Sequence, residues 1–293
     1  MSDSHRFSST VLASVTLAVL TGMVAGRPEA ATQPGPWTLV VCAPGYPGST
    51  AEAQPAMDAL AAATAAGAGW KPADLRAIYF ENEEAGLERL AASDAAVALA
   101  PLPFWLQHRE SLRLVPHLQA VEQGGEAAEP WTLVAPAGLV SGPSSLAAFE
   151  LVTICGYAPR FVRGPALAGW GQLPSEVRIT ASNNVLSALR RASAGAKVAV
   201  LLDRTSSAAL PTLPFASKLQ VVTRSAPLPV AVLSAVGNRL PASRLKALLK
   251  GLLSLDAAPA GREALAGVRL ARLVAADQAA LAQARGLYDR AKE

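Results

Sequence analysis

Two short stretches, PWTLVAPAG (residues 130–138) and APLPVAVLSAV (residues 226–236), decide how this sequence is organised. Each holds an apolar run bounded by proline or glycine, which is the pattern of a buried strand. One complete set of strand and helix signals lies between the two stretches, and a second set lies outside them. We therefore predict that the chain passes there from one α/β lobe to another and back, which makes a hinge and a cleft.

Length and composition allow one large or two modest domains and argue against a nucleic-acid partner. The 293 residues are 51% hydrophobic, which is ample for real cores. The net charge is only +4, and the arginines are spread along predicted helices beside acidic residues. Because no basic run with interleaved aromatic residues is present, we interpret these charges as solvated helix faces.

The N-terminus has the pattern of an export signal. Residues 1–6 are short and polar with one arginine, residues 11–24 are apolar and uncharged, and Val24-Ala25-Gly26 offers small residues for cleavage. We assign residues 1–31 to a signal peptide and expect a periplasmic mature protein that starts between Arg27 and Thr32. An uncleaved membrane anchor is the alternative. No cysteine directly follows the apolar core, so lipid anchoring there is not expected.

The first lobe is predicted from residues 32–130 and 226–293. Strands are expected at 37–42, 75–80, 95–100 and 112–121, with helices at 51–66 and 83–92 between the first three. Strands that alternate with helices over short connections predict a parallel sheet. After the return crossing we expect helices at 241–255, 257–266 and 275–292, all packed on this lobe.

The second lobe is predicted from residues 131–225. Its further strands are expected at 151–155, 177–181, 197–202 and 219–223, with an amphipathic helix at 184–192. The glycine- and proline-rich residues 156–174 have no clear secondary-structure pattern. Cys42 and Cys155 fall in strand-like runs of different lobes, so we expect two unpaired thiols buried in separate cores.

Candidate ligand-binding residues follow the predicted strands. Ligands of open α/β sheets bind beyond the carboxyl ends of the strands, where helix N-termini favour anions. The residues in such positions are Tyr46, Ser49, Thr50, Glu81, Asn82, Phe104 and Trp105 in the first lobe and Tyr157, Arg160, Ser182, Asn183, Asn184, Asp203 and Arg204 in the second.

Structural roles are open for several of these candidates. Ser49, Thr50, Asn183 and Asn184 are also residues that helix capping selects. The aromatic residues Tyr46, Phe104 and Trp105 are also suited to packing under loops. Arg160 is also able to pair with Glu150 instead of a ligand.

The order of elements resembles the type II periplasmic substrate-binding proteins of ABC importers. The resemblance rests on WTLVA (131–135), SLAAFEL (145–151) and APAGREAL (258–265), and it is closest to the phosphate-, phosphite- and phosphonate-binding group. It implies an α/β, two-lobed fold in which each lobe is a mixed sheet flanked by helices and two hinge segments cross between them. It also implies a monomer that delivers a small-molecule ligand to an ABC permease in the inner membrane.

The likeness to phosphonate binders is interrupted at one loop. Those proteins usually carry a Ser-Thr-Ser-Gly type loop after the first strand of the second lobe, whereas this chain has Gly156-Tyr157-Ala158-Pro159-Arg160. Arg160 is then the best fixed cation for an anionic ligand, with Tyr46 and Trp105 as the opposite wall. Asp203 and Glu81 would repel a pure oxyanion and suit a zwitterion whose ammonium they hold.

No pattern in the sequence predicts catalysis. His108 and His117 lack a nucleophile motif or a carboxylate at a diagnostic spacing, and we expect packing or surface roles for both. No metal-ligand cluster and no phosphate-binding glycine fingerprint is present, so no cofactor is expected. The sequence predicts a solute receptor for a phosphonate- or phosphate-like anion or zwitterion, or alternatively an envelope sensor or partner-binding module of the same fold.

Overall fold

The first lobe is built on a six-stranded mixed sheet. The computed structural model describes residues 36–292, so the predicted signal peptide lies outside the described residues. The sheet order is β13-β4-β12-β3-β1-β2. Its strands are β1 (Trp37–Cys42), β2 (Leu75–Phe80), β3 (Ala95–Pro101), β4 (Leu114–Glu122), β12 (Ala231–Val236) and β13 (Leu270–Ala275). The expected parallel pairing is confirmed, because β1 runs parallel to both β2 and β3.

Helices cover this sheet because its strands are apolar on both faces. All seven residues of β3 are buried. The covering helices are α1 (Thr50–Ala68), α2 (Glu83–Ala91), α3 (Leu102–His108), α7 (Ala242–Leu253) and α8 (Pro259–Gly267). Helices α1 and α7 approach closely at Gly251, where a Cβ atom would lie 2.6 Å from the Thr64 carbonyl oxygen. Only glycine fits that crossing.

The second lobe has a five-stranded sheet in the order β10-β6-β9-β7-β8. Its strands are β6 (Thr132–Pro136), β7 (Glu150–Thr153), β8 (Arg178–Ala181), β9 (Val198–Leu202) and β10 (Leu219–Arg224). Strand β7 is parallel to β8 and β9, whereas β6 is antiparallel to β9 and β10. The short helices of this lobe are α4 (Pro159–Phe161), α5 (Val185–Ser193) and α6 (Arg204–Ala209). A π-helical turn over Val162–Ala166 fills part of the stretch that the sequence left open.

Short 3-10 helices make several connections in both lobes. They are Pro72–Asp74, Pro143–Ala148, Leu210–Thr212, Ala216–Lys218 and Leu255–Ala257. None of the helices among residues 36–292 is long and apolar enough to cross a membrane.

Two strands carry the chain between the lobes. Strand β5 (Ala128–Glu129) pairs antiparallel with β11 (Leu228–Pro229), and the two form a small sheet of their own. The predicted two-lobed fold with a pair of crossing segments is confirmed.

The C-terminal helix α9 (Gln278–Arg290) was predicted to pack on the first lobe, and it contacts the second lobe as well. The residue just before α9 is bound to β4, because the Asp277 amide donates a hydrogen bond to the Gln119 side-chain oxygen at 3.0 Å. Its far end lies against the second lobe, where a Cβ on Gly164 would meet the Leu287 carbonyl oxygen at 2.7 Å. The buried residues Leu281, Ala284 and Tyr288 give α9 an apolar face for both lobes.

One apolar core runs through both lobes. Cys42 at the end of β1 and Cys155 after β7 belong to the same buried cluster, as do Phe104 and Phe161. Both cysteines are free and buried, as expected, but the expectation of separate cores is wrong. Burial raises the pKa of each thiol to about 12, so both are protonated at neutral pH.

Candidate functional site

Two loops from opposite lobes meet at the carboxyl ends of β1 and β7. Gly45 lies in the first loop with φ +85°, and a Cβ atom there would lie 2.5 Å from the carbonyl oxygen of Ile154 in the second. The two backbones therefore touch at a point where only glycine fits both the conformation and the space. This contact places the residues that follow, Tyr46 and Tyr157, at the boundary between the lobes.

Tyr46, Tyr157 and Asp203 are half-buried residues near this boundary. Burial raises the pKa of Tyr46 well above its usual range, and the nearby Asp203 carboxylate raises it further. Burial also raises the pKa of Tyr157 well above its usual range, and Cys155 and Tyr46 add to the effect. Both phenols are therefore neutral hydroxyl groups at physiological pH. Tyr46 is thus within electrostatic range of both Tyr157 and Asp203.

The amino terminus of α1 is already occupied by a carboxylate of the protein. The Thr50 amide and hydroxyl both donate to Glu81 Oε2 at 3.0 Å. Ser49 caps the helix and forms a reciprocal capping box with Glu52. An anionic side chain therefore takes the place beside the positive end of the helix dipole where an oxyanion of a ligand would bind.

The polar candidates of the second lobe cap its helices. The Asn184 side chain accepts the Ser187 amide at 3.1 Å at the start of α5, and both Asn183 and Asn184 are exposed. Asp203 accepts the Ser206 amide at 2.8 Å at the start of α6. One oxygen of Asp203 is used in this way, so its negative charge stays available to the boundary region.

Phe104 and Trp105 belong to the core, which corrects their assignment to the ligand-facing wall. They are 0% and 4% exposed and lie in the cluster shared by the lobes. Helix α3 starts directly after the buried strand β3, so these large side chains turn inward. The Trp105 indole N–H has no hydrogen-bond partner among the described residues.

Arg160 is engaged at the end of α9, which does not fit its predicted role as the anion partner. Its guanidinium donates to the carbonyl oxygens of Tyr288, Asp289 and Ala291 at 3.2, 3.3 and 3.3 Å. It also lies 4.6 Å from the centre of the Tyr288 ring. A cation is favoured there by the negative end of the helix dipole. The alternative partner Glu150 pairs with Arg178 and Arg191 instead.

Two glutamates that the sequence did not single out as a site, Glu122 and Glu129, lie at the two ends of the connector after β4. Arg204 of the second lobe lies 2.6 Å from Glu129 and 3.3 Å from Glu122. Burial raises the pKa of Glu129, and the Arg204 charge opposes that shift. The sequence signal for the two glutamates is the acidic connector over residues 122–129, which ends in the crossing strand β5.

The charges that gather at this boundary are mostly negative. The fields of Asp203, Glu122 and Glu129 all raise the pKa of Tyr46, whereas Arg204 is the cation that contacts the two glutamates. Carboxylates attract an ammonium group and repel a bare oxyanion, whereas a neutral tyrosine hydroxyl forms hydrogen bonds with either. The arrangement therefore suits binding of a ligand that carries a positive charge.

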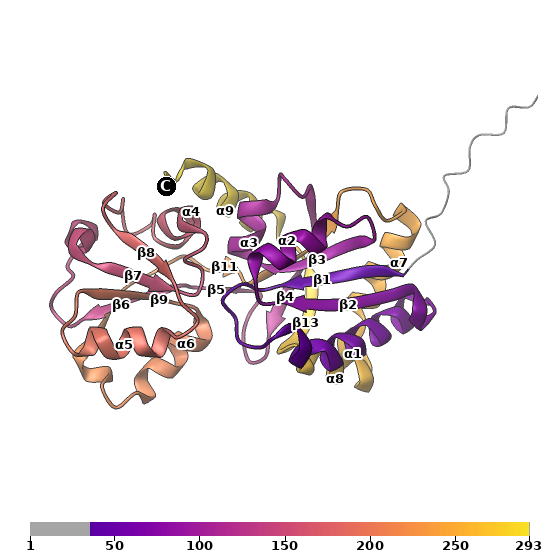
Figure 1. Cartoon of the computed structure of the whole chain (residues 1–293), viewed down its shortest axis with the longest axis horizontal. Coiled ribbons are helices and arrows are strands. Elements are labelled where there is room, and N and C mark those ends of the chain that lie inside the picture. Colours follow the sequence, from indigo (N-terminus) through magenta and orange to yellow (C-terminus); the bar gives the residue numbers. More distant parts are fainter. Residues whose placement is uncertain (1–35, 293) are drawn as a thin grey trace, which may run out of the picture. The chain divides into compact units, whose positions relative to one another are not determined.

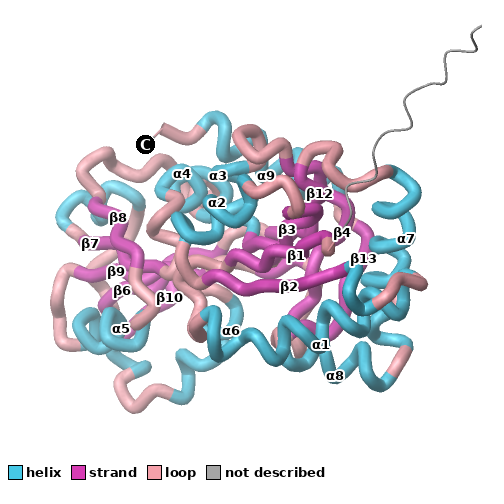
Figure 2. The backbone as a smooth tube through the Cα atoms, turned by 45° about the vertical axis from the view of Figure 1, so that its right-hand side comes forward, coloured by secondary structure: helices cyan, strands magenta, loops and turns pink. Residues whose placement is uncertain are grey.

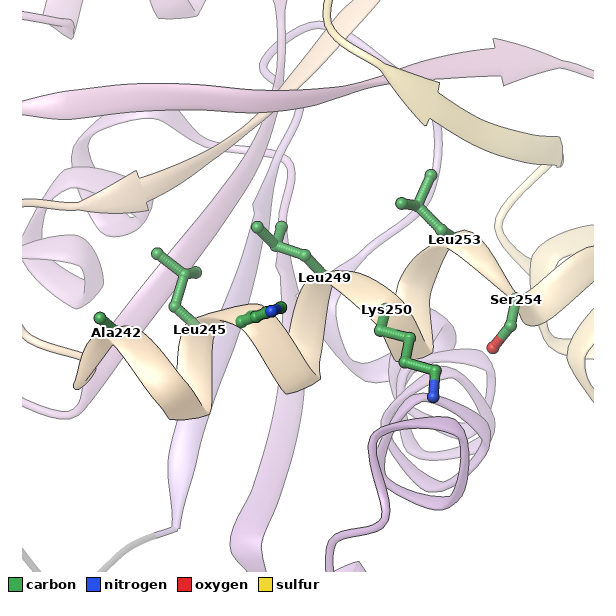
Figure 3. Close-up of a pocket in the computed structure, with 7 residues that line it drawn as sticks. Ala242, Leu245, Leu249, Lys250, Leu253 and Ser254 are labelled. Atoms are coloured by element: carbon green, nitrogen blue, oxygen red, sulfur yellow. The ribbon is translucent and has the colours of Figure 1, made fainter.

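A hollow along α7 is chemically different. It measures about 600 Å³ and is lined by Leu245, Leu249 and Leu253 together with Lys246 and Lys250. Figure 3 shows the three leucines on one side of the helix, with Lys250 directed elsewhere. Ligand sites need a few polar groups that converge on the ligand, and this hollow lacks them.

Solved structures share the fold at low sequence identity. XAC2383 from Xanthomonas citri, bound to chloride, is 13% identical with a TM-score of 0.66, covering 86% of this chain and 98% of its own. A binding protein of an ABC phosphonate transporter from Pseudomonas aeruginosa is 13% identical with a TM-score of 0.60, covering 86% of each chain. PhnD1 from Prochlorococcus marinus, in complex with methylphosphonate, is 14% identical with a TM-score of 0.59, covering 87% of this chain and 98% of its own.

These structures confirm the resemblance at the level of the fold. No protein-family model and no curated protein matches the sequence.

Proposed function

We propose that this chain is a periplasmic solute-binding protein that captures a small molecule between its lobes for an ABC importer. The proposal rests on the fold shared with binding proteins of phosphonate transporters and on the contact of strand-end loops across the lobe boundary. Loops at the carboxyl ends of strands are where α/β folds bind their ligands. The chain acts by binding, and its partners are the ligand and the permease.

The ligand that we propose is a zwitterion with an ammonium group, such as an aminoalkylphosphonate. The carrying observation is the negative charge of Asp203, Glu122 and Glu129 that acts on the half-buried Tyr46, with Tyr157 close to Tyr46. Glu81 occupies the α1 terminus and Arg160 is engaged at the end of α9, so neither that helix terminus nor Arg160 is free for an oxyanion. This argues against a simple phosphate or alkylphosphonate as the preferred ligand.

Two probes that differ by one charge test the proposal. Calorimetry with 2-aminoethylphosphonate and with ethylphosphonate compares the same anionic group with and without an ammonium. We expect the amino compound to bind more tightly, and at 100 times its dissociation constant to stabilise the protein by about 2.7 kcal/mol. Equal affinity for the two probes would show that the carboxylates do not recognise the ammonium group.

A charge-only variant locates the ammonium. Asp203→Asn keeps a side chain that caps α6 and removes the negative charge. We expect it to weaken 2-aminoethylphosphonate binding about tenfold or more. Asp277→Asn, at the cap of α9, is the matched control and should bind like the parent.

An envelope sensor or partner-binding module is the second candidate function. This second function is favoured because the Glu81 carboxylate occupies the N-terminus of α1, where a solute receptor would bind the anionic group of its ligand. A screen in which no amine, oxyanion or amino acid stabilises the protein would support this function over uptake.

Export is tested on the N-terminus. The proposed periplasmic location requires cleavage near residues 27–32. Intact-mass measurement of protein recovered from the periplasm should show this loss, and a membrane-bound form that retains Met1 would support the anchor instead.

A further inference from the structure

Charge is distributed unevenly between the two lobes. Residues 131–225 hold nine arginines and lysines against three acidic residues, whereas the rest of 36–292 holds fifteen against sixteen. The positive surplus of the described chain therefore lies in the second lobe. Such an asymmetry between parts of a chain favours an anionic partner for the basic part.

Five of these cations gather at one end of the second sheet. Strands β7, β8 and β9 are parallel and begin at this end, and β6, which is antiparallel to β9, finishes there (Figure 1). Arg178 is the first residue of β8, Lys197 directly precedes β9, and Lys218 directly precedes β10, whose first residue pairs with the last residue of β6. Arg190 and Arg191 lie in the last turn of α5, which ends shortly before β9. All five residues are exposed, and we call them the basic pole.

Acidic side chains do not neutralise the basic pole. Glu150, at the start of β7, is 14% exposed, and its carboxylate is shared by Arg178 and Arg191. Lys197 and Lys218 form no ion pair with any residue of 36–292. The other acidic residue at this end, Glu176, lines a hollow in which the other charged residues are cations, namely Arg163, Arg290 and Lys292. Five cations thus stand against two carboxylates that already face other positive charges.

An exposed leucine stands at the same end of the sheet. Leu139, in the turn that follows β6, is 52% exposed, which is the largest value among the large hydrophobic side chains of residues 36–292. A backbone hydrogen bond of 3.0 Å joins this turn to the carbonyl of Lys218. The Gln220 side chain bonds to the backbone on both sides of Leu139, at 3.1 and 2.9 Å. The leucine is therefore held at a defined position beside the basic pole.

An anionic bilayer fits this combination of cations and a leucine. Phospholipid headgroups are mobile, so they adapt to cations that come from several elements, and an apolar side chain can enter the region between them. Binding of single-stranded nucleic acid uses exposed aromatic rings, and none is among the exposed large hydrophobic side chains of residues 36–292. A stable protein interface has an apolar centre of several residues, which one leucine does not provide.

We propose that the basic pole docks the second lobe on a membrane surface rich in anionic phospholipid, with Leu139 inserted among the headgroups. Because the positive surplus lies on one lobe, the field of the protein turns that lobe toward the surface. No residue of the basic pole belongs to the proposed zwitterion site, so the docking does not depend on which ligand the lobes enclose.

A fluorophore at residue 139 tests the contact locally. Leu139→Cys offers one reactive thiol for an environment-sensitive dye, because burial raises the pKa of both Cys42 and Cys155 to about 12. We expect the emission to shift to the blue with vesicles of phosphatidylcholine and phosphatidylglycerol in equal parts, and not with phosphatidylcholine alone. Attachment of the chain through residues 1–31 does not by itself move this local signal. Leu253→Cys is the matched control on α7 of the first lobe, where Leu253 is 44% exposed, and its dye should respond to neither vesicle.

Charge variants separate the basic pole from general attraction. Lys197→Gln and Lys218→Gln, combined in the labelled chain, remove two charges that form no ion pair among residues 36–292. The vesicle concentration needed for half of the shift should rise about tenfold or more, since each basic residue near an anionic surface contributes about fivefold. Lys246→Gln with Lys250→Gln removes two exposed charges from α7 and should behave like the parent. High salt should abolish the shift, because it screens exposed charges.

The proposal is wrong if the dye at residue 139 responds equally to phosphatidylcholine alone, if it does not respond to phosphatidylglycerol, or if the α7 variant loses as much as the variant of the basic pole. Binding of the basic pole to duplex DNA or to polyglutamate, without a dye shift on vesicles, would assign it to a nucleic acid or an acidic protein instead. Unchanged thermal transitions verify that the variants are folded. Loss of 2-aminoethylphosphonate binding in Asp203→Asn with vesicle docking intact would show that docking and ligand binding are independent.

Discussion

Glu150 shows how single contacts join the elements of the second lobe. It stands at the start of β7 and is 14% exposed. Its carboxylate accepts hydrogen bonds from the side chains of Thr180 and Arg178 of β8, both at 2.9 Å, and from Arg191 of α5 at 2.7 Å. These donors hold the pKa of Glu150 below its ordinary value, with the Arg191 hydrogen bond as the main cause. The contacts therefore favour its charged form.

We expect Glu150→Gln to lower the free energy of unfolding by about 1 kcal/mol at pH 7, since both arginines are more than half exposed. A depressed pKa gives stability above the usual value of 4.5 that is lost as pH falls toward the folded-state pKa. The difference from the parent, measured by urea unfolding, should therefore shrink below pH 4.5. Glu176→Gln, an exposed glutamate, is the control, and a difference that grows in acid would contradict the account.

Residue roles were predictable where the cause is local. Helix capping was one predicted role for Asn184, and it depends only on residues a few positions away. The structure shows this cap, in which the Asn184 side chain accepts the Ser187 amide. The partners of Arg160 lie 128 to 131 positions away in the sequence, so no local pattern indicates them. Likewise, Glu81 reaches Thr50 only because β2 pairs with β1.

At the scale of elements, α9 is held at its last turn by an arginine from each lobe. Arg109, after α3, pairs with Asp289 at 2.6 Å and lies 5.6 Å from the centre of the Tyr288 ring. Arg160, in α4, contacts the other side of this turn through three carbonyl oxygens. The helix end thus joins α3 to α4.

We expect Arg160→Ala to release this turn. Amide hydrogen exchange at residues 285–290 should become faster, because three hydrogen bonds and a cation–π contact are lost. The free energy of unfolding should fall by about 1–3 kcal/mol. Arg285→Ala, an exposed arginine on the same helix, serves as the control. Unchanged exchange in Arg160→Ala would show that the apolar face alone holds α9.

Elements were predictable where periodicity and end signals agree. The strands expected at 37–42 and 75–80 are β1 and β2, and the helix expected at 241–255 is α7. Strand β13 was missed because LARLVA does not alternate and its partner β4 lies about 150 residues earlier. The π turn at 162–166 contains Pro165 and packs against α9, so its shape depends on tertiary contact.

At the scale of the whole described chain, the approach of the lobes depends on Gly45. We expect Gly45→Ala to keep the lobes apart, because its Cβ would meet the Ile154 carbonyl. Small-angle scattering should show a larger radius of gyration, and 2-aminoethylphosphonate should bind more weakly.

Gly48→Ala is the matched control for Gly45→Ala. Gly48 also has a left-handed φ, of 109°, but a Cβ there meets nothing within 4 Å. Both variants carry backbone strain, and only Gly45→Ala has the clash between lobes. Equal scattering curves for the two variants would mean that strain alone explains the effect.

The path of α9 has a mechanical consequence. A pulling force applied between residues 36 and 292 enters through β1, an inner strand bonded on both sides, and leaves through the last turn of α9. That turn is fastened by a few side-chain contacts, whereas β1 is fastened by two ladders of backbone bonds that must shear together. The terminal helix, 13 residues long, should therefore peel away first as a short, low-force step in a stretching trace, before either sheet gives way.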